Sequence, residues 1–192
     1  MDKSAVVAFF DNKASSWDAE LIRDDKVINE ILTLGGVVQG VNVLDVACGT
    51  GVLFDDYFLR NVNSVTGVDI SSQMVRICKE KYPEVSVICA DAETFSFDKA
   101  FDCIMIYNAF PHFVDSDRLF SNLTKYLKVG GRLTVAHGMS RQDIMACHSG
   151  EAHNVSNILP DALELKSIMS SYLTVDIAVS DSKKYVVSGV KI

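Results

Sequence analysis

The 192-residue sequence predicts an α/β protein with a seven-stranded, mostly parallel, doubly wound sheet, an antiparallel C-terminal hairpin and helices on both faces. Two observations support this fold class. Short apolar runs alternate with segments of helical periodicity along most of the chain, which is typical of parallel strands joined by helical crossovers. Only a short polar turn separates the last two apolar runs, so these runs are expected to pair as an antiparallel hairpin.

The predicted strands are short and apolar. The first is apolar almost throughout, as a strand covered by helices on both faces should be. Four more strands follow before the hairpin, and helical segments separate most of them, which gives five strand–helix units in all. The strands are expected at 41–47, 64–70, 85–90, 101–107, 132–137, 174–179 and 185–192.

The predicted helices begin and end at recognisable residues. Two helices precede the first strand, and Gly35 ends the second of them. The helix after the first strand is expected to begin at Gly51, and Pro160 suits the first turn of the last helix. The other helices are expected to begin at Ser71 or Ser72, at about Asp115 and at Ser140. The helix from Asp115 is expected to reach Leu127, and Gly130-Gly131 ends it.

Composition and charge exclude several classes of protein. One domain over 1–192 is expected, since domains typically hold roughly 100–200 residues. The net charge is −7 with no basic stripe, which argues against a nucleic-acid partner. No apolar run approaches the ~18 residues of a membrane span, and no signal segment is evident, so a cytoplasmic location is expected. Five cysteines without a Cys-x-x-Cys pair argue against a disulfide framework or a structural zinc site.

The most informative segment is a glycine-rich turn at the end of the first strand, residues 43–51. Glycine permits a tight turn and lets a ligand approach the backbone. A dinucleotide fingerprint would have a third glycine where Phe54 stands, and the charge of Asp45 would be unfavourable beside a pyrophosphate. An ammonium group would suit Asp45 better. The alternative is a glycine-rich turn with no ligand.

This turn resembles motif I of the class I S-adenosylmethionine (SAM)-dependent methyltransferases of small-molecule type, and the resemblance extends over nearly the whole chain. It implies SAM as the cofactor. It also implies that four residues of the turn contact the amino-acid part of SAM. These are Asp45, Ala47, Gly49 and Gly51.

The next two strand ends also carry acidic residues. Asp69 follows the second strand, about twenty residues after the glycine turn, where an acidic side chain can accept both hydroxyls of a ribose. The resemblance implies that Ile70 and Met74 lie beside the cofactor. It also implies that Asp91 receives the adenine amino group, with Ala92 adjacent. The alternatives are a helix-capping Asp69 and a solvated turn at Asp91.

The exit of the fourth strand resembles motif IV, which faces the methyl group that is transferred. Tyr107 and Asn108 are therefore expected to contact the cofactor. The segment departs from the Asn-Pro-Pro-Tyr pattern of enzymes that methylate amide or base nitrogens. His112 is the candidate general base, since the unperturbed pKa of histidine lies near 6.5. The alternative is that His112 only packs over the cofactor.

Two segments are expected to cover the pocket. Residues 1–36 resemble the N-terminal helical lid that closes over SAM, and the aromatic face of Trp17 would attract the sulfonium cation. The alternative for Trp17 is a core position on an amphipathic helix. Residues 138–160 follow the fifth strand and are expected to lie on the acceptor side.

The acceptor-side segment begins after His137, a candidate substrate residue together with Arg141 and His148. A metal or soft-ligand site in the cluster of His137, His148 and His153, with Cys147 as an additional ligand, is a second hypothesis, since imidazole and thiolate are suitable ligands. The simpler interpretation is a helix capped by Ser140 and Asp143, with His148 packed on one face.

The predicted reaction is transfer of the SAM methyl group to a small-molecule acceptor, with release of S-adenosylhomocysteine. Three alternatives remain at this point: a module that binds SAM without turnover, a non-methyl transferase such as an aminopropyltransferase, and an NAD-dependent oxidoreductase. The sequence predicts no membrane partner and a monomer or homodimer.

Overall fold

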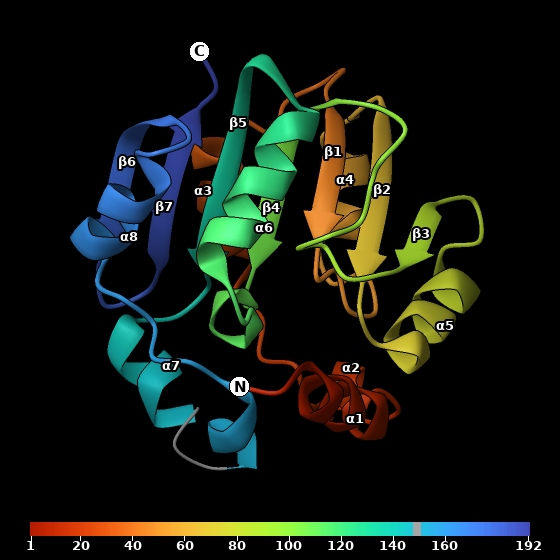
Figure 1. Cartoon of the computed structure of the whole chain (residues 1–192). Helices are drawn as coiled ribbons and strands as arrows, with labels where there is room; N and C mark the ends of the chain where they lie inside the picture. The colour runs from red at the N-terminus through yellow and green to blue at the C-terminus, as the bar shows by residue number, and fades with distance from the viewer. Residues whose placement is uncertain (148–150) are drawn as a thin grey trace.

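A computed structural model describes residues 1–147 and 151–192, and of Glu151 only the backbone. Among these residues, seven strands form one sheet in the order β3-β2-β1-β4-β5-β7-β6 (Figure 1). The first five strands pair in parallel, whereas β7 runs antiparallel to both β5 and β6. This confirms the predicted fold class. The strands are β1 Asn42–Val46, β2 Ser64–Asp69, β3 Ser86–Cys89, β4 Phe101–Tyr107, β5 Leu127–His137, β6 Thr174–Ser180 and β7 Tyr185–Val190.

Helices cover both faces of the sheet. In Figure 1, α6 and α8 lie in front of the sheet and α3 and α4 behind it, while α1 and α2 lie below the edge at which β1, β2 and β4 end. The α-helices are α1 Lys3–Lys13, α2 Trp17–Glu20, α3 Asp25–Leu34, α4 Phe54–Leu59, α5 Ser72–Lys81, α6 Ser116–Leu123, α7 Arg141–Cys147 and α8 Ala162–Met169. Three short 3-10 helices are η1 Phe110–His112, η2 Thr124–Tyr126 and η3 Glu151–Val155.

The central strands are buried from both sides, which explains their near-continuous apolar sequences. Leu44 of β1 packs into one hydrophobic cluster with Phe120 of α6 and Leu165 of α8. Its neighbour Val43 points the other way, into a second cluster with Tyr57 of α4. The sheet is thus held between two apolar layers.

Two predicted helix boundaries were wrong, and backbone geometry explains both. The helix expected from Gly51 begins at Phe54, because Gly51 has a φ of +86°, which a helix cannot contain. The helix expected to reach residue 127 ends at Leu123, and β5 begins at Leu127. Gly130, with a φ of +78°, lies within β5, where the pairing with β4 shifts register as at a β-bulge.

The start of the last helix is also displaced. α8 begins at Ala162, and Pro160 precedes the helix rather than occupying its first turn. Asp161 is the N-cap residue: its carboxylate accepts from the backbone of Glu164, whose side chain accepts from the Asp161 N–H. This reciprocal capping box satisfies two backbone donors at once and therefore sets the helix start.

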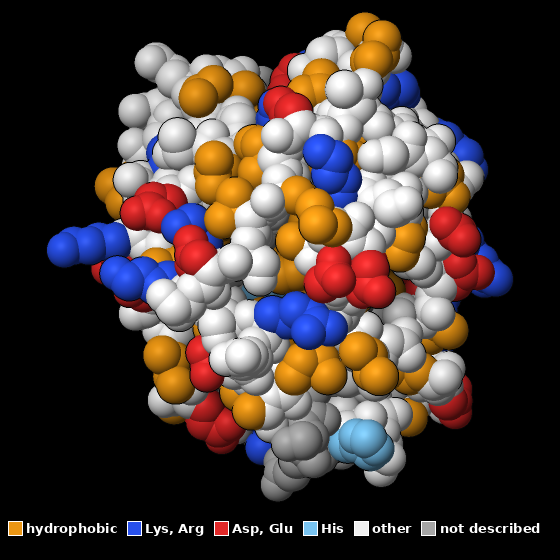
Figure 2. Space-filling view, turned by 90° about the vertical axis from the view of Figure 1, so that its left-hand side faces the viewer, with side chains coloured by type: hydrophobic (Ala, Val, Ile, Leu, Met, Phe, Trp, Pro, Cys, Tyr) orange, Lys and Arg blue, Asp and Glu red, His pale blue; other side chains and the backbone are white. Residues whose placement is uncertain are grey.

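The surface carries both signs of charge. Figure 2 shows the side of the molecule on which β6 and α8 lie, where Lys and Arg side chains are interspersed with Asp and Glu. Over the described part of the chain, no helix has the length and apolar character needed to cross a membrane.

A matched pair of leucines on α8 tests the packing of the sheet. Leu165 is 0% exposed, whereas Leu163 on the same helix is 72% exposed. We expect Leu165→Ala to lower the free energy of unfolding by about 2–5 kcal/mol, because it removes buried methyl groups and leaves a cavity. Leu163→Ala should change it by less than about 0.5 kcal/mol. Urea denaturation measures both, and equal effects would contradict this packing.

Candidate active site

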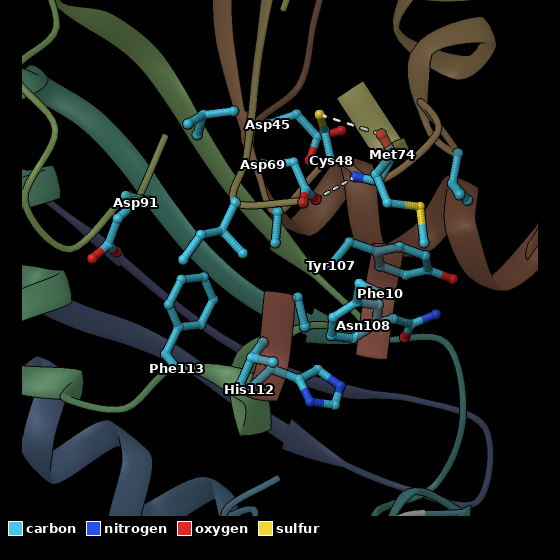
Figure 3. Close-up of a pocket in the computed structure, with 18 of the residues that line it drawn as sticks. Phe10, Asp45, Cys48, Asp69, Met74, Asp91, Tyr107, Asn108, His112 and Phe113 are labelled. Carbon is cyan, nitrogen blue, oxygen red and sulfur yellow. Dashed lines mark hydrogen bonds between the residues drawn. The ribbon is translucent and has the colours of Figure 1, made fainter. Parts of the chain in front are cut away.

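A pocket of about 980 Å³, including its open mouth, lies at the carboxyl ends of β1, β2 and β4, covered by α1. Ligands of parallel sheets bind at this edge. The structure brings together His112 and all but one of the twelve residues predicted to bind the cofactor. Those that line the pocket are Trp17, Asp45, Ala47, Gly49, Asp69, Ile70, Met74, Asp91, Ala92, Tyr107 and Asn108 (Figure 3).

Asp45, at the end of β1, is a buried carboxyl group, 3% exposed. Its Oδ2 accepts a hydrogen bond of 3.2 Å from the Tyr57 hydroxyl. Burial raises the pKa of Asp45 to about 8, and the nearby Asp69 raises it further, while the Tyr57 hydrogen bond opposes both. A cationic group in the pocket would favour the ionised form of Asp45.

Asp69, at the end of β2, organises the turn beside it. Its Oδ2 accepts from the Gly49 N–H and its Oδ1 from the Ser71 N–H, each at 2.8 Å. Ser71 in turn caps α5, since its hydroxyl accepts from the Met74 N–H. Burial raises the pKa of Asp69 to about 6, although both backbone hydrogen bonds act to lower it.

The glycine-rich turn uses the left-handed backbone region three times. Ala47, Gly49 and Gly51 have φ values of 55°, 54° and 86°. Alanine rarely adopts this conformation, and its occurrence at Ala47 fits the pattern of strain at binding sites. Gly51 faces away from the pocket: a Cβ there would lie 2.7 Å from the Tyr82 ring and 3.1 Å from Cys78 Sγ. Glycine is therefore required at position 51 so that the turn can pack against α5.

Asp91 pairs with a lysine that the sequence did not identify. Lys3 Nζ, on α1, lies 2.5 Å from Asp91 Oδ2 and 2.6 Å from Glu93 Oε2. Glu93 is 2% exposed, and its Oε1 accepts from the backbone N–H groups of Val114 and Asp115. Glu93 thus joins α1 to the loop after β4.

Asp11 and Asp18 fasten the N-terminal segment over the pocket with four further hydrogen bonds. Asp11 accepts from the Ser71 hydroxyl at 2.6 Å and from the Gln73 N–H at 3.0 Å, at the start of α5. Asp18 accepts from Thr50 and from Lys81. The ring of Phe10 meets Trp17 edge-on at 5.7 Å, and both line the pocket.

The end of β4 presents a tyrosine and an amide. Asn108 adopts a left-handed conformation with a φ of 52°, and its Oδ1 accepts from the Gly138 N–H at 3.0 Å. A Cβ at Gly138 would overlap the hydroxyl of Tyr107, so a larger residue there would displace the Tyr107 side chain. Burial raises the pKa of Tyr107 to about 12, and its hydroxyl therefore stays protonated at neutral pH.

His112 lies across the pocket from Asp45 and Asp69 (Figure 3). Its Nδ1 is 2.8 Å from the carbonyl oxygen of Val155 and 3.2 Å from the Ser156 hydroxyl. The ring of Phe10 meets the imidazole edge-on at 4.9 Å. The side chain is therefore held on both sides while still facing the cavity.

Two of the three candidate substrate residues, His137 and Arg141, lie outside this pocket. His137 is 2% exposed and packs edge-on against Tyr185, and it does not line the pocket. Arg141 donates to the carbonyl oxygens of Leu159 and Pro160, which gives it a structural task outside the pocket. His148 lies outside the described residues. An acceptor role for these three stays a prediction.

The metal hypothesis finds no support in the described part of the chain. No group of three His, Cys, Asp or Glu side chains there is arranged to hold a metal ion. Cys147 is exposed at the end of α7, whereas His137 is buried.

The buried state of Asp45 predicts a pH dependence of stability. Its carboxyl has a pKa of about 8 in the fold against an ordinary value of 3.8. The folded state therefore holds an extra proton between these values, so its contribution to stability is lost as the pH rises from about 4 to 8, by up to about 1.4 kcal/mol per pH unit. Asp69, with a pKa of about 6, adds to this loss only below pH 6 to 7.

Asp45→Asn should therefore flatten the loss of stability between pH 6 and 8 in the ligand-free protein. The introduced amide would keep an acceptor for the Tyr57 hydroxyl but could not ionise. Urea denaturation of both proteins at several pH values measures the difference. Parallel stability curves over this window would contradict the assignment.

Comparison with known proteins places these features in a family. Residues 43–131 match the family model described as a methyltransferase domain. The ubiquinone/menaquinone biosynthesis C-methyltransferase UbiE of Campylobacter jejuni is 26% identical over 159 residues, which cover 78% of this chain and 66% of the relative. The malonyl-[acyl-carrier protein] O-methyltransferase of Priestia megaterium is 30% identical, with coverage of 78% and 57%. The chain thus spans between half and two thirds of these curated relatives.

A solved structure agrees with the fold over the full length of both chains. Magnesium protoporphyrin IX methyltransferase from Synechocystis PCC 6803, with bound S-adenosylhomocysteine, has a TM-score of 0.74 at 15% identity and 100% coverage of each chain. The resemblance noted in the sequence is confirmed: the chain contains a methyltransferase domain and is similar to SAM-dependent methyltransferases.

Proposed function

We propose that this chain binds SAM in the pocket covered by α1 and transfers its methyl group to a small-molecule acceptor, releasing S-adenosylhomocysteine. One observation carries the proposal. The carboxylates of Asp45, Asp69 and Asp91 stand at the ends of three neighbouring strands and line one pocket. SAM offers three groups that suit them: an ammonium, a ribose diol and an adenine amine.

Each carboxylate has a distinct partner in this proposal. Asp45 is buried and would gain an ionic partner in the SAM ammonium. Asp69 accepts one backbone N–H on each oxygen and has acceptor capacity left for the two ribose hydroxyls. Asp91 would share its carboxylate between Lys3 and the adenine amine. The same three carboxylates are a poor match for NAD, because buried carboxylates repel its pyrophosphate.

The chemistry needs alignment more than activation. SAM supplies an electrophilic methyl group on a sulfonium, and the pocket holds it against the acceptor. Phe10 and Trp17 present aromatic rings that favour a nearby cation. The acceptor atom forms a bond to the methyl carbon as the carbon–sulfur bond breaks, and His112 receives the acceptor's proton. Residues 1–36 act as a lid over this reaction.

The acceptor is expected to be small. Its side of the pocket is bounded by Phe10, His112 and Phe113. Val155 and Ser156, from the segment expected on the acceptor side, contact His112. The names of the relatives point to a quinone precursor in one case and a malonyl group in the other, which are both small acceptor groups. The cytoplasmic location and the monomer or homodimer expected from the sequence stay predictions.

Ligand binding separates SAM from NAD. We expect SAM and S-adenosylhomocysteine to raise the melting temperature, and NAD to leave it unchanged. Asp69→Asn should weaken SAM binding roughly 10- to 100-fold, because a hydrogen bond to a charged group contributes about 1.5–3 kcal/mol. Asp98→Asn, at an exposed position, is the matched control. Calorimetric titration measures both, and stabilisation by NAD alone would reject the proposal.

The catalytic assignment is tested by release of S-adenosylhomocysteine across a panel of small phenols, thiols, amines and carboxylates. With an acceptor in hand, His112→Gln should lower kcat by roughly 10²–10⁴-fold and leave SAM affinity nearly unchanged, because only proton transfer is lost. His153→Gln, at an exposed position of η3, is the control and should match the parent protein. An unchanged kcat in His112→Gln would show that this side chain only packs.

A further inference from the structure

We infer that residues 155–157 position the imidazole of His112, and that Asn157 is the residue that holds this segment in place. This inference rests on the proposed function, because it specifies how His112 is prepared to accept a proton. This segment runs from Val155, the last residue of η3, toward α8. It was expected on the acceptor side from the sequence, without a specific role.

The hydrogen bond at Nδ1 determines the tautomer of His112. The Val155 carbonyl oxygen, 2.8 Å away, can only accept, so Nδ1 carries the ring proton in the neutral imidazole. The lone pair is then on Nε2, which is the arrangement a general base needs. The Ser156 hydroxyl, at 3.2 Å from the same nitrogen, supports this contact from the adjacent residue.

Asn157 fastens the segment to the loop that carries His112. Its backbone N–H donates to the Pro111 carbonyl at 2.7 Å, and its Nδ2 donates to the Phe113 carbonyl at 2.8 Å. The two bonds therefore bracket His112 on either side along the chain. The buried side chain of Val155, 4% exposed, anchors the same segment to the protein interior.

The opposite face of the imidazole meets the N-terminal segment. Phe10 contacts the ring edge-on at 4.9 Å, and α1 packs against η3. The imidazole is thus fixed between an aromatic ring and a carbonyl oxygen. Rotation of the ring would break the Nδ1 contact, so the position of the carbonyl decides which nitrogen carries the proton.

Removing the Asn157 amide should weaken this arrangement without touching the pocket. In Asn157→Ala the Val155 carbonyl would be less well placed, and the share of His112 with its proton on Nε2 would rise. That form cannot accept a proton at Nε2. We expect kcat to fall about five- to tenfold, as for the loss of one hydrogen bond, with the KM for SAM unchanged. Asn154→Ala, exposed on η3, is the control and should match the parent protein.

The direct test is ¹⁵N NMR of protein labelled at histidine, with the His112 signals identified by their absence from His112→Gln. At a pH where the ring is neutral, the parent protein should show Nδ1 protonated, Asn157→Ala should show a mixture, and Asn154→Ala should match the parent. A parent protein with the proton on Nε2 overturns the inference, whether or not Asn157→Ala folds or any acceptor is found. Failure to detect methyl transfer would instead count against the proposed function.

A second test measures the effect of Asn157→Ala on kcat in the parent protein and in His112→Gln. Asn157→Ala should shift the pH dependence of kcat, and it should cost nothing more when combined with His112→Gln, because a positioning residue acts only through its partner. An equal loss of kcat in both backgrounds would show an independent structural effect and would overturn the inference.

Discussion

The parallel pairing of β1, β2 and β4 is the constraint on which the pocket depends. Parallel strands end at the same edge of a sheet, so side chains that follow them converge even though they are far apart in sequence. Asp45 pairs in register with Gly67, and Asp69 follows one residue after the pairing ends. The two carboxylates therefore come close enough for the charge of one to raise the pKa of the other.

This convergence is unfavourable for the empty protein. Burial of Asp45 and Asp69 raises the pKa of each, because neither charge is well solvated. The backbone N–H groups of Gly49 and Ser71 stabilise the charge of Asp69, whereas in the described part of the chain the side-chain donor to Asp45 is the Tyr57 hydroxyl. A ligand with a cationic group would favour the ionised form of Asp45 and so oppose this effect. The site thus stores unfavourable electrostatic energy that a ligand such as SAM can release on binding.

The cofactor half of the site was predictable because it follows local rules. A buried strand, a glycine turn and an acidic residue at the next strand end are all visible within a few residues. Lys3 and Glu93 were missed, because Lys3 meets its partners some 90 residues away and a buried glutamate after a strand looks like a solvated turn. Gly51 was assigned to the cofactor for its place in the motif, yet its φ and the Tyr82 ring require glycine for packing.

The proposed acceptor side depends less on the register of the strands, since α1 and connecting segments form most of it. It is built by α1, the loop at η1 and the segment after η3, which meet only in three dimensions around His112. These connections can change without disturbing the sheet or the carboxylates at its edge. This chain is similar both to a relative named for methylation of carbon and to one named for methylation of oxygen. This agrees with a conserved sheet whose connecting segments differ. The identity of the acceptor must therefore be sought in contacts such as Phe10 to His112 and Asn157 to Phe113, rather than in the glycine turn.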